Sequence, residues 1–278
     1  MELRLWAKDM LCKYMPNVKQ YHRMIYPISQ VFAYASDEDV GILDQDLWQR
    51  AKKKIDRNLI KPTPVPEDET QVFTDEERLF LRQMVIEDLE KYDYNPTSAG
   101  LQILLMLETG IRIGEACGLK WEDIVDGYIR IRRQADNNRV KLPKTAAAIR
   151  DIPLTDEAIR VLEMVRQYNE KHGLSGEWVF LNTDPNKYEG RLSYHAADRK
   201  LRKLCERMQA VHRSPHKLRK TFASLLKNSN VVTDRNIQRA MGHANISTTM
   251  NCYVFDQHKK EEQVESIKRA LELERPDE

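Results

Sequence analysis

A proline-rich segment divides the chain and limits what each part can fold into. It reads Lys61-Pro62-Thr63-Pro64-Val65-Pro66 and continues with acidic residues. Proline fixes φ and has no backbone N–H to donate, so alternating prolines favour an extended, exposed linker over a helix or an inner strand. The sequence therefore predicts a domain at residues 1–61, a linker at 62–72 and a larger domain at 73–278.

Length and composition are those of a soluble globular protein. The 278 residues suffice for two domains, and the larger one can bury a full-sized core. No apolar run is long enough to cross a bilayer, and the start lacks the apolar region of a signal peptide, so we expect a cytoplasmic protein. The widely spaced cysteines favour reduced thiols over disulfides or a zinc site; they are Cys12, Cys117, Cys205 and Cys252.

Charge is distributed unevenly, although the net charge is only +2. Residues 67–93 are acidic, whereas 128–150 and 199–220 are strongly basic. A charge run is usually a solvated face, but these two basic segments flank candidate phosphate-binding residues and so favour a DNA surface. The residues expected to bind DNA are Arg130, Arg132, Arg133, Lys141, Arg199, Arg202, Lys203, Lys217 and Lys220.

The apolar pattern predicts a mainly α fold with a small antiparallel β-sheet, an α+β class. Alternation at 128–132 and 149–154 indicates two paired strands, separated by a polar, basic hairpin. A third short strand is expected at 178–181. Thr74 with Glu77 forms a capping box, and Thr155 is a further helix N-cap. Helices are expected at about 18–35, 43–58, 74–90, 98–108, 114–119, 155–173, 193–209, 215–227, 234–241, 247–255 and 259–273.

Two basic side chains begin one of these helices. Ser214 is a suitable N-cap and Pro215 a suitable first helical residue, so His216 and Arg219 lie three positions apart on one face. The N-terminus of a helix attracts anions, which makes this a candidate phosphate site. Alone, the pattern is equally that of an ordinary exposed basic helix start.

Other candidate residues follow breaks in the helical pattern. Gly242 is typical of a helix C-terminus and is followed by His243, and Tyr253 falls two turns into the next expected helix. Upstream, Arg112 follows a Thr-Gly break with Glu115 one turn on, and Lys144 lies in the basic hairpin. Each residue alone has an ordinary structural explanation. Because all of them occur in this order along the chain, a shared functional site is favoured.

These motifs resemble those of the tyrosine recombinases, the phage-integrase family. The similarity extends over about residues 70–260. The matching segments are Thr109-Gly110-Ile111-Arg112 continuing to Ile124, Pro143-Lys144-Thr145 followed by Arg150-Asp151-Ile152-Pro153-Leu154, His216-Lys217-Leu218-Arg219 continuing to Ser224, and Met241-Gly242-His243 continuing to Tyr253.

The resemblance implies a role for each residue. Tyr253 is the expected nucleophile, and Arg112 and Arg219 are expected to bind the non-bridging oxygens of the scissile phosphate. Lys144 would protonate the leaving 5′ oxygen. His216 would assist proton transfer and His243 would hydrogen-bond the phosphate. Glu115 would support the site.

The resemblance also implies partners and an activity. The expected enzyme is a site-specific DNA recombinase of a phage or other mobile element, in the bacterial cytoplasm or nucleoid. It would act on double-stranded DNA as a homotetramer, through a Holliday junction, with an accessory bending or directionality factor as a further partner. No cofactor or metal is expected. The alternatives are a non-catalytic DNA-binding regulator on the same fold and a type IB topoisomerase-like enzyme.

The ends of the chain carry two further expectations. Residues 1–61 resemble the family's core-binding domain loosely and are short for it, so the chain is either a compact member or a truncated one that lacks an arm-binding domain. The helix at 259–273 is expected to pack against a neighbouring protomer, with packing on its own domain as the alternative.

Overall fold

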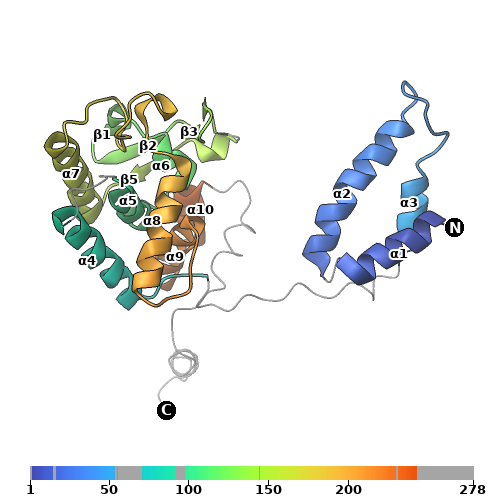
Figure 1. Cartoon of the computed structure of the whole chain (residues 1–278), viewed down its shortest axis with the longest axis horizontal. Helices are drawn as coiled ribbons and strands as arrows, with labels where there is room; N and C mark the ends of the chain where they lie inside the picture. Colours follow the sequence, from blue (N-terminus) through green and yellow to red (C-terminus); the bar gives the residue numbers. More distant parts are fainter. Residues whose placement is uncertain are drawn as a thin grey trace, which may run out of the picture. The chain divides into compact units, whose positions relative to one another are not determined.

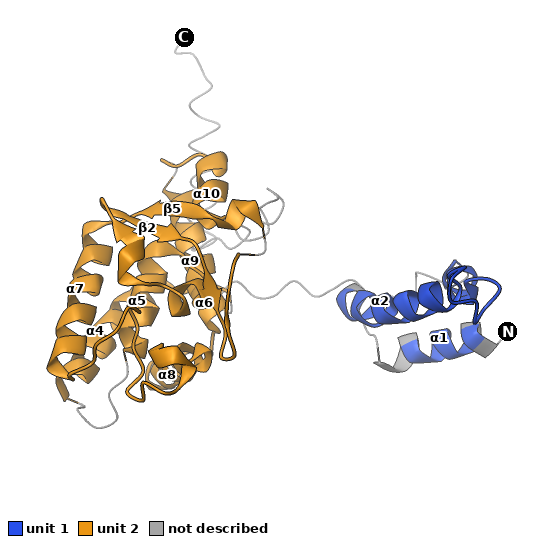
Figure 2. Ribbon diagram, turned by 90° about the horizontal axis from the view of Figure 1, so that it is seen from above, with its two compact units in different colours: residues 1–66 blue, residues 67–278 orange. Residues whose placement is uncertain are grey.

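The computed structural model describes residues 2–14, 17–53, 55, 71–91, 98–143, 145–229 and 231–242. The chain divides into two compact units, Met1–Pro66 and Glu67–Glu278 (Figure 2). Each unit has its own apolar core. The helices expected at 247–255 and 259–273 lie outside the described residues.

The described residues of unit 1 form three helices, α1 (Glu2–Tyr14), α2 (Val18–Ala35) and α3 (Leu47–Lys52). Trp48 of α3 is the centre of its small core, because its ring is fully buried and its Nε1 donates to Ser29 Oγ at 2.9 Å. The helix expected at 43–58 is wrong in extent at its start, because Asp46 is the N-cap; among the described residues of that range, 47–52 are helical. The first helix was not predicted from the sequence.

Unit 2 is organised around α5 (Ala99–Thr109), which is buried along almost its whole length. Its sequence is nearly all apolar, so no face of this helix favours water. It packs against α4 (Asp75–Lys91), α7 (Asp156–Lys171), α8 (Tyr194–Arg207) and α9 (Pro215–Asn228), which surround it in Figure 1. Two shorter helices, α6 (Ile113–Cys117) and α10 (Asp234–Met241), complete the α-helices of this unit that the structure describes.

Local signals fix the ends of several helices as the sequence predicts. Thr74 and Glu77 form the reciprocal capping box of α4, with backbone-to-side-chain bonds of 2.9 and 3.2 Å. The hydroxyl of Thr155 accepts from Ala158 N at the start of α7. Gly110 ends α5 in the left-handed conformation, with φ +64°.

The predicted antiparallel pair is confirmed as the centre of a small sheet. Its order is β1 (Ile124–Val125), β2 (Tyr128–Ile131) and β5 (Arg150–Pro153). Ile129 pairs with Ile152, and both side chains are buried in the core. Between β2 and β5, β3 (Gln134–Ala135) and β4 (Val140–Lys141) form a separate two-stranded hairpin.

The strand expected at 178–181 is absent, although its residues are described. Trp178 and Leu181 form only isolated bridges, to Lys120 and Arg191, and Val179 and Phe180 between them are buried. The apolar run thus marks burial in the core and not a strand, because no neighbouring segment supplies a ladder. With that correction, the predicted class, mainly α with a small antiparallel sheet, is confirmed. Among the described residues, no helix is both long and apolar enough to span a membrane.

Candidate active site

Arg112 is positioned by the short helix that follows it. It is the N-cap of α6, and its own N–H donates to Glu115 Oε2 at 2.8 Å. Its Nη1 donates to Glu115 Oε1 at 2.7 Å, and its Nη2 donates to the carbonyl of Gly242 at 3.3 Å. The side chain remains one-third exposed, so this guanidinium is both fixed and accessible.

Glu115 is a buried carboxylate that binds two arginines of the site, and its side chain is 3% exposed. Besides Arg112, it binds Arg150 of β5, whose Nη1 and Nη2 donate to its two oxygens at 3.0 and 2.9 Å. Burial by itself raises the pKa of this carboxyl. The hydrogen bonds and charge of Arg150, with the charges of Arg112 and Arg219, outweigh burial and lower the pKa to about 2. Glu115 is therefore ionised at neutral pH.

Arg219 comes from α9 and is buried, with 1% of its surface exposed. Its Nη1 donates to the carbonyl of Gly110 at 2.6 Å, and its Nη2 donates to the carbonyl of Met241. These carbonyls lie at the C-terminal ends of α5 and α10, where helix dipoles favour a cation. Two helix ends thus hold one guanidinium at the edge of the site.

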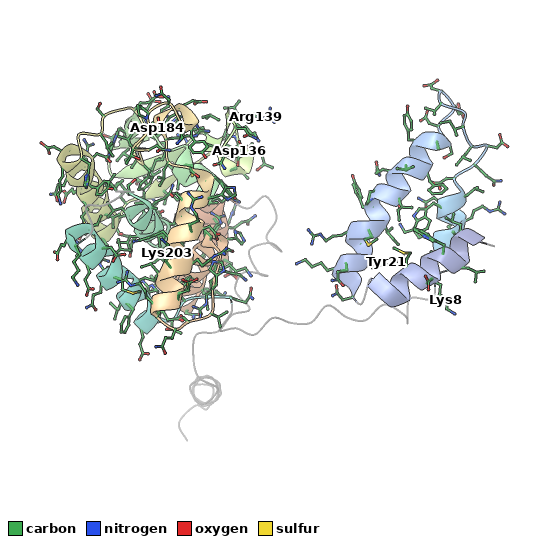
Figure 3. All side chains as sticks on the ribbon, in the orientation of Figure 1. Lys8, Tyr21, Asp136, Arg139, Asp184 and Lys203 are labelled. Carbon is green, nitrogen blue, oxygen red and sulfur yellow. The ribbon has the colours of Figure 1, made fainter. Side chains whose placement is uncertain are left out.

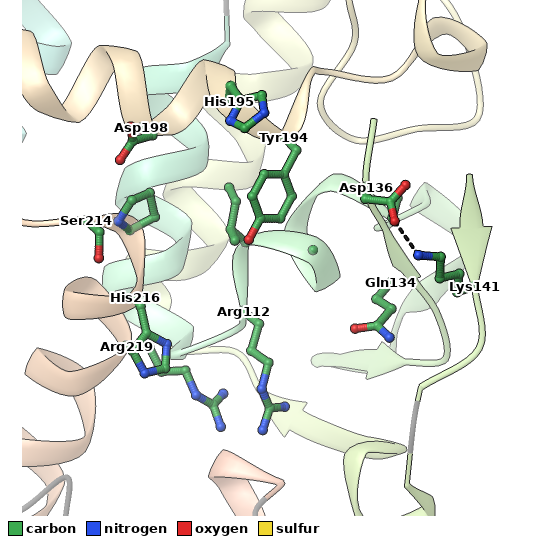
Figure 4. A pocket seen from close by; sticks show the side chains of 14 residues that line it. Arg112, Gln134, Asp136, Lys141, Tyr194, His195, Asp198, Ser214, His216 and Arg219 are labelled. Atoms are coloured by element: carbon green, nitrogen blue, oxygen red, sulfur yellow. Dashed lines mark hydrogen bonds and ion pairs between the residues drawn. The ribbon is translucent and has the colours of Figure 1, made fainter. Parts of the chain in front are cut away.

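His216 lies one turn before Arg219 on α9, and both line a cavity of about 580 Å³ with Arg112. Figure 4 shows the guanidinium groups of Arg112 and Arg219 pointing the same way, beside the imidazole. The His216 side chain reaches the surface, but desolvation by the surrounding wall, followed by the charges of Arg219, Lys220, Arg112 and Lys217, lowers its pKa to about 4. The ring is neutral at neutral pH.

The opposite wall of the cavity is polar and mixed in charge. Asp136 and Lys141 of the β3–β4 hairpin form an ion pair there (Figure 4). Residues of α8 form the adjoining part of the wall, among them Tyr194, His195 and Asp198. The cavity therefore lies between a cationic side and a hairpin, an arrangement suited to an anionic ligand of extended shape. Within the described residues, no three His, Cys, Asp or Glu side chains are grouped to hold a metal ion.

The structure brings together four of the predicted site residues, namely Arg112, Glu115, His216 and Arg219. Three others, Lys144, His243 and Tyr253, lie outside the described residues. Their roles stay predictions from the sequence.

Most of the predicted DNA-binding residues form hydrogen bonds or ion pairs with other side chains of the protein. Lys217 and Lys220 both donate to Gln71 Oε1, the latter at 3.0 Å. Exposed Arg199 and Lys203 lie on α8, where Figure 3 labels Lys203. The remaining residues pair with carboxylates: Arg130 with Asp126, Arg132 with Asp151, Arg133 with Glu122 and Asp123, Lys141 with Asp136, and Arg202 with Asp198. Contact with DNA would compete with these pairs, and this set stays a prediction.

Sequence reasoning missed the part that Arg150 plays. Arg150 begins the Arg150-Asp151-Ile152-Pro153-Leu154 segment that resembles the family. The sequence assigns it no role beyond being one of seven basic residues at 128–150. Its partner Glu115 lies 35 positions away, so no local pattern pairs the two. The only available signal is the Arg-Asp-Ile-Pro-Leu match itself, which places an arginine at the first position of a strand.

The sequence profile of the phage integrase family matches residues 80–260, about two-thirds of the chain, and the chain belongs to this family. It is 30% identical over 161 residues to the tyrosine recombinase XerC of Xylella fastidiosa strain M23, covering 55% of this chain and 48% of that protein. It is 29% identical over 170 residues to the transposase from transposon Tn916 of Enterococcus faecalis, covering 55% and 41%.

Solved structures have the same fold. The Tn1549 transposon integrase in complex with transposon right end DNA aligns with a TM-score of 0.68 at 20% identity, over 97% of this chain and 84% of that one. The XerA recombinase aligns with a TM-score of 0.54 at 19% identity, over 100% and 92%. The chain spans about half the length of the curated relatives that it matches.

Proposed function

We propose that this protein is a site-specific DNA recombinase that integrates or excises a mobile element. It cleaves and rejoins DNA through a 3′-phosphotyrosyl intermediate on Tyr253 and exchanges strands through a Holliday junction. The observation that carries the proposal is that Arg112, His216 and Arg219 line one cavity. Arg112 lies at the start of α6, and the other two lie on α9, more than 100 residues along the chain. Family membership supports it, because XerC and the Tn916 transposase bear the names of such enzymes.

Two fixed guanidinium groups suit a transferring phosphate. As the phenol attacks, negative charge builds on the non-bridging oxygens, and donors already in place stabilise that charge without reorganising. Arg219 is held by two backbone carbonyls, and Arg112 by Glu115 and a third carbonyl. Loss of one such donor commonly lowers a rate by ~10²–10³-fold.

Proton transfer is assigned to the remaining groups. A tyrosine phenol has a pKa near 10, so it is a weak nucleophile at neutral pH until a base or positive field assists it. His216 is neutral at that pH, so it can accept a hydrogen bond from the phenol and assist proton transfer at the tyrosine. Lys144 donates the proton to the leaving 5′ oxygen, and His243 hydrogen-bonds the phosphate. The phosphotyrosyl bond retains the energy for rejoining.

The same proposal gives each unit a role and names the partners of the protein. Unit 1 acts as a core-binding domain, and unit 2 catalyses strand exchange on double-stranded DNA. A tetramer brings two duplexes together in the cytoplasm or nucleoid, with the residues at 259–273 packing between protomers and an accessory bending or directionality factor assisting. Structures of the Tn1549 transposon integrase in complex with transposon right end DNA and with circular intermediate DNA support DNA as the partner.

One selection experiment tests the reaction and identifies the DNA site together. The full chain is incubated with a pool of randomised duplexes nicked so that a cleaved strand end diffuses away, and the DNA that stays attached after denaturation is sequenced over repeated rounds. We expect attached DNA to converge on one sequence, which then serves as the substrate duplex. Specific binding without attachment would support a regulator instead. Relaxation of any supercoiled plasmid with no enriched site would support a topoisomerase.

A further inference from the structure

Arg150 is an arginine whose hydrogen bonds are directed into the protein. Its side chain is 7% exposed. Nε donates to the carbonyl of Ala240 at 2.7 Å and Nη1 to that of Ala148 at 3.0 Å, while Nη1 and Nη2 bind the two oxygens of Glu115. A guanidinium has five N–H donors and no acceptor, so these bonds use most of what Arg150 can offer. It is therefore poorly placed to bind DNA itself.

These bonds join three elements of unit 2. Arg150 begins β5, Glu115 belongs to α6, and Ala240 lies in the last turn of α10. Paired bonds from one planar fork to both oxygens of a carboxylate fix its orientation as well as its position. The carboxylate that receives them is the one that holds Arg112.

The turn after α10 also packs directly on Arg150. Gly242 adopts φ +59°, and a Cβ there would lie 3.0 Å from Cδ and Nη1 of Arg150 and from the carbonyl of Ala147. The carbonyls of Met241 and Gly242 accept from Arg219 and Arg112 respectively. The same short stretch of backbone thus contacts Arg150 and both guanidinium groups that face the cavity, and His243 is the next residue along the chain.

We propose that Arg150 is a positioning residue for DNA cleavage, which rests on the function proposed above. It fixes Glu115 and the end of α10 as one unit, so that Arg112 and Arg219 keep the spacing that a phosphate requires. It acts through these groups and does not contact DNA. A displacement of about 1 Å at a reacting centre can cost ~10²-fold in rate, so the loss of Arg150 slows cleavage strongly.

The test is single-turnover attachment of the full chain to the selected nicked duplex, measured beside equilibrium binding of that duplex. We expect Arg150→Ala to lower the attachment rate at saturating protein by ~10²-fold while the Kd for DNA changes little. Arg150→Lys keeps the charge but cannot bind both oxygens with a planar fork, so it restores little of the rate. Arg160→Ala is the matched control, since Arg160 pairs with Glu157 on an exposed face at 2.6 Å.

A double-mutant comparison separates positioning from general loss of structure. If Arg150 acts through Glu115, then Arg150→Ala adds little to the rate loss in a Glu115→Gln background, whereas independent effects would multiply. Arg150→Gln, a neutral variant that retains an N–H donor, replaces Arg150→Ala if thermal unfolding shows that the alanine variant is not folded.

Three results would overturn the inference. They are a folded Arg150→Ala protein that attaches at the wild-type rate, a loss confined to the Kd for DNA, and multiplicative effects in the double mutant. Failure of the wild-type chain to attach to any duplex would instead overturn the proposed function. The two failures are therefore distinguishable in one set of measurements.

Discussion

The replacement Glu115→Gln tests the buried charge cluster directly. The glutamine would keep the size of the side chain but remove the negative charge that Arg112 and Arg150 bind at 2.7–3.0 Å. Arg112 is one-third exposed, but Arg150 is 7% exposed, so water cannot take over the interaction that Arg150 loses. Removal of one partner from a buried ion pair is strongly destabilising, because the other charge is left uncompensated.

The magnitude follows from the lowered pKa of Glu115. The pKa falls from 4.5 to about 2, and each unit of pKa difference corresponds to about 1.4 kcal/mol, so the ionised carboxylate contributes on the order of 3 kcal/mol to the stability of unit 2 at pH 7. Because the folded pKa is the lower one, this contribution is present above pH 4.5 and is lost as pH falls toward 2. The stability difference between wild type and variant should therefore fall to about 1 kcal/mol at pH 3.

Urea unfolding of the full chain measures this difference at both pH values. Unit 1 has its own core and contains no partner of Glu115 among its described residues, so its transition is the internal control. We expect only the unit 2 transition to move to lower urea. Equal stabilities of wild type and variant at pH 7, or a difference that does not shrink at low pH, would refute the reasoning.

Two further predictions concern neighbouring residues. In the free protein, NMR titration of His216 should give a pKa of about 4, and binding of duplex DNA should raise it because a phosphate offsets the surrounding arginines; a value near 6.5 without DNA would contradict this description. Gly110→Ala should destabilise unit 2 by ~1–3 kcal/mol or more, because φ is +64° and the new Cβ would lie 2.3 Å from the Phe222 ring. Gly127→Ala is its control, with φ +79° but nothing within 4 Å, and a thermal melt in which the two variants behave alike would exclude the Phe222 contact as a cause.

Local chemistry explains which elements could be predicted from the sequence. Thr74 with Glu77, Thr155 and Gly110 act within a few residues of themselves, so their sequence patterns locate the ends of α4, α5 and α7 closely. The alternation that predicts β2 and β5 works because one face of that sheet is buried.

Long-range partners explain what could not be predicted. The run at 178–181 is apolar because the core surrounds it, and its backbone meets its neighbours only at isolated bridges, which do not extend into the ladder of a strand. The site residues likewise divide into those that local sequence predicts and those that depend on long-range partners. The helix start predicts that His216 and Arg219 share a face, but only the folded chain shows Arg219 held by the ends of α5 and α10, and Glu115 shared between Arg112 and Arg150.

The central claim is that the tyrosine at position 253 becomes joined to DNA. The most direct measurement is mass spectrometry of the protease-digested adduct between the full chain and the selected nicked duplex. The account predicts a single modified peptide, with the 3′-phosphate of the cleaved strand on Tyr253, and no adduct from Tyr253→Phe. DNA attached at another residue, or an undiminished adduct from Tyr253→Phe, would contradict it.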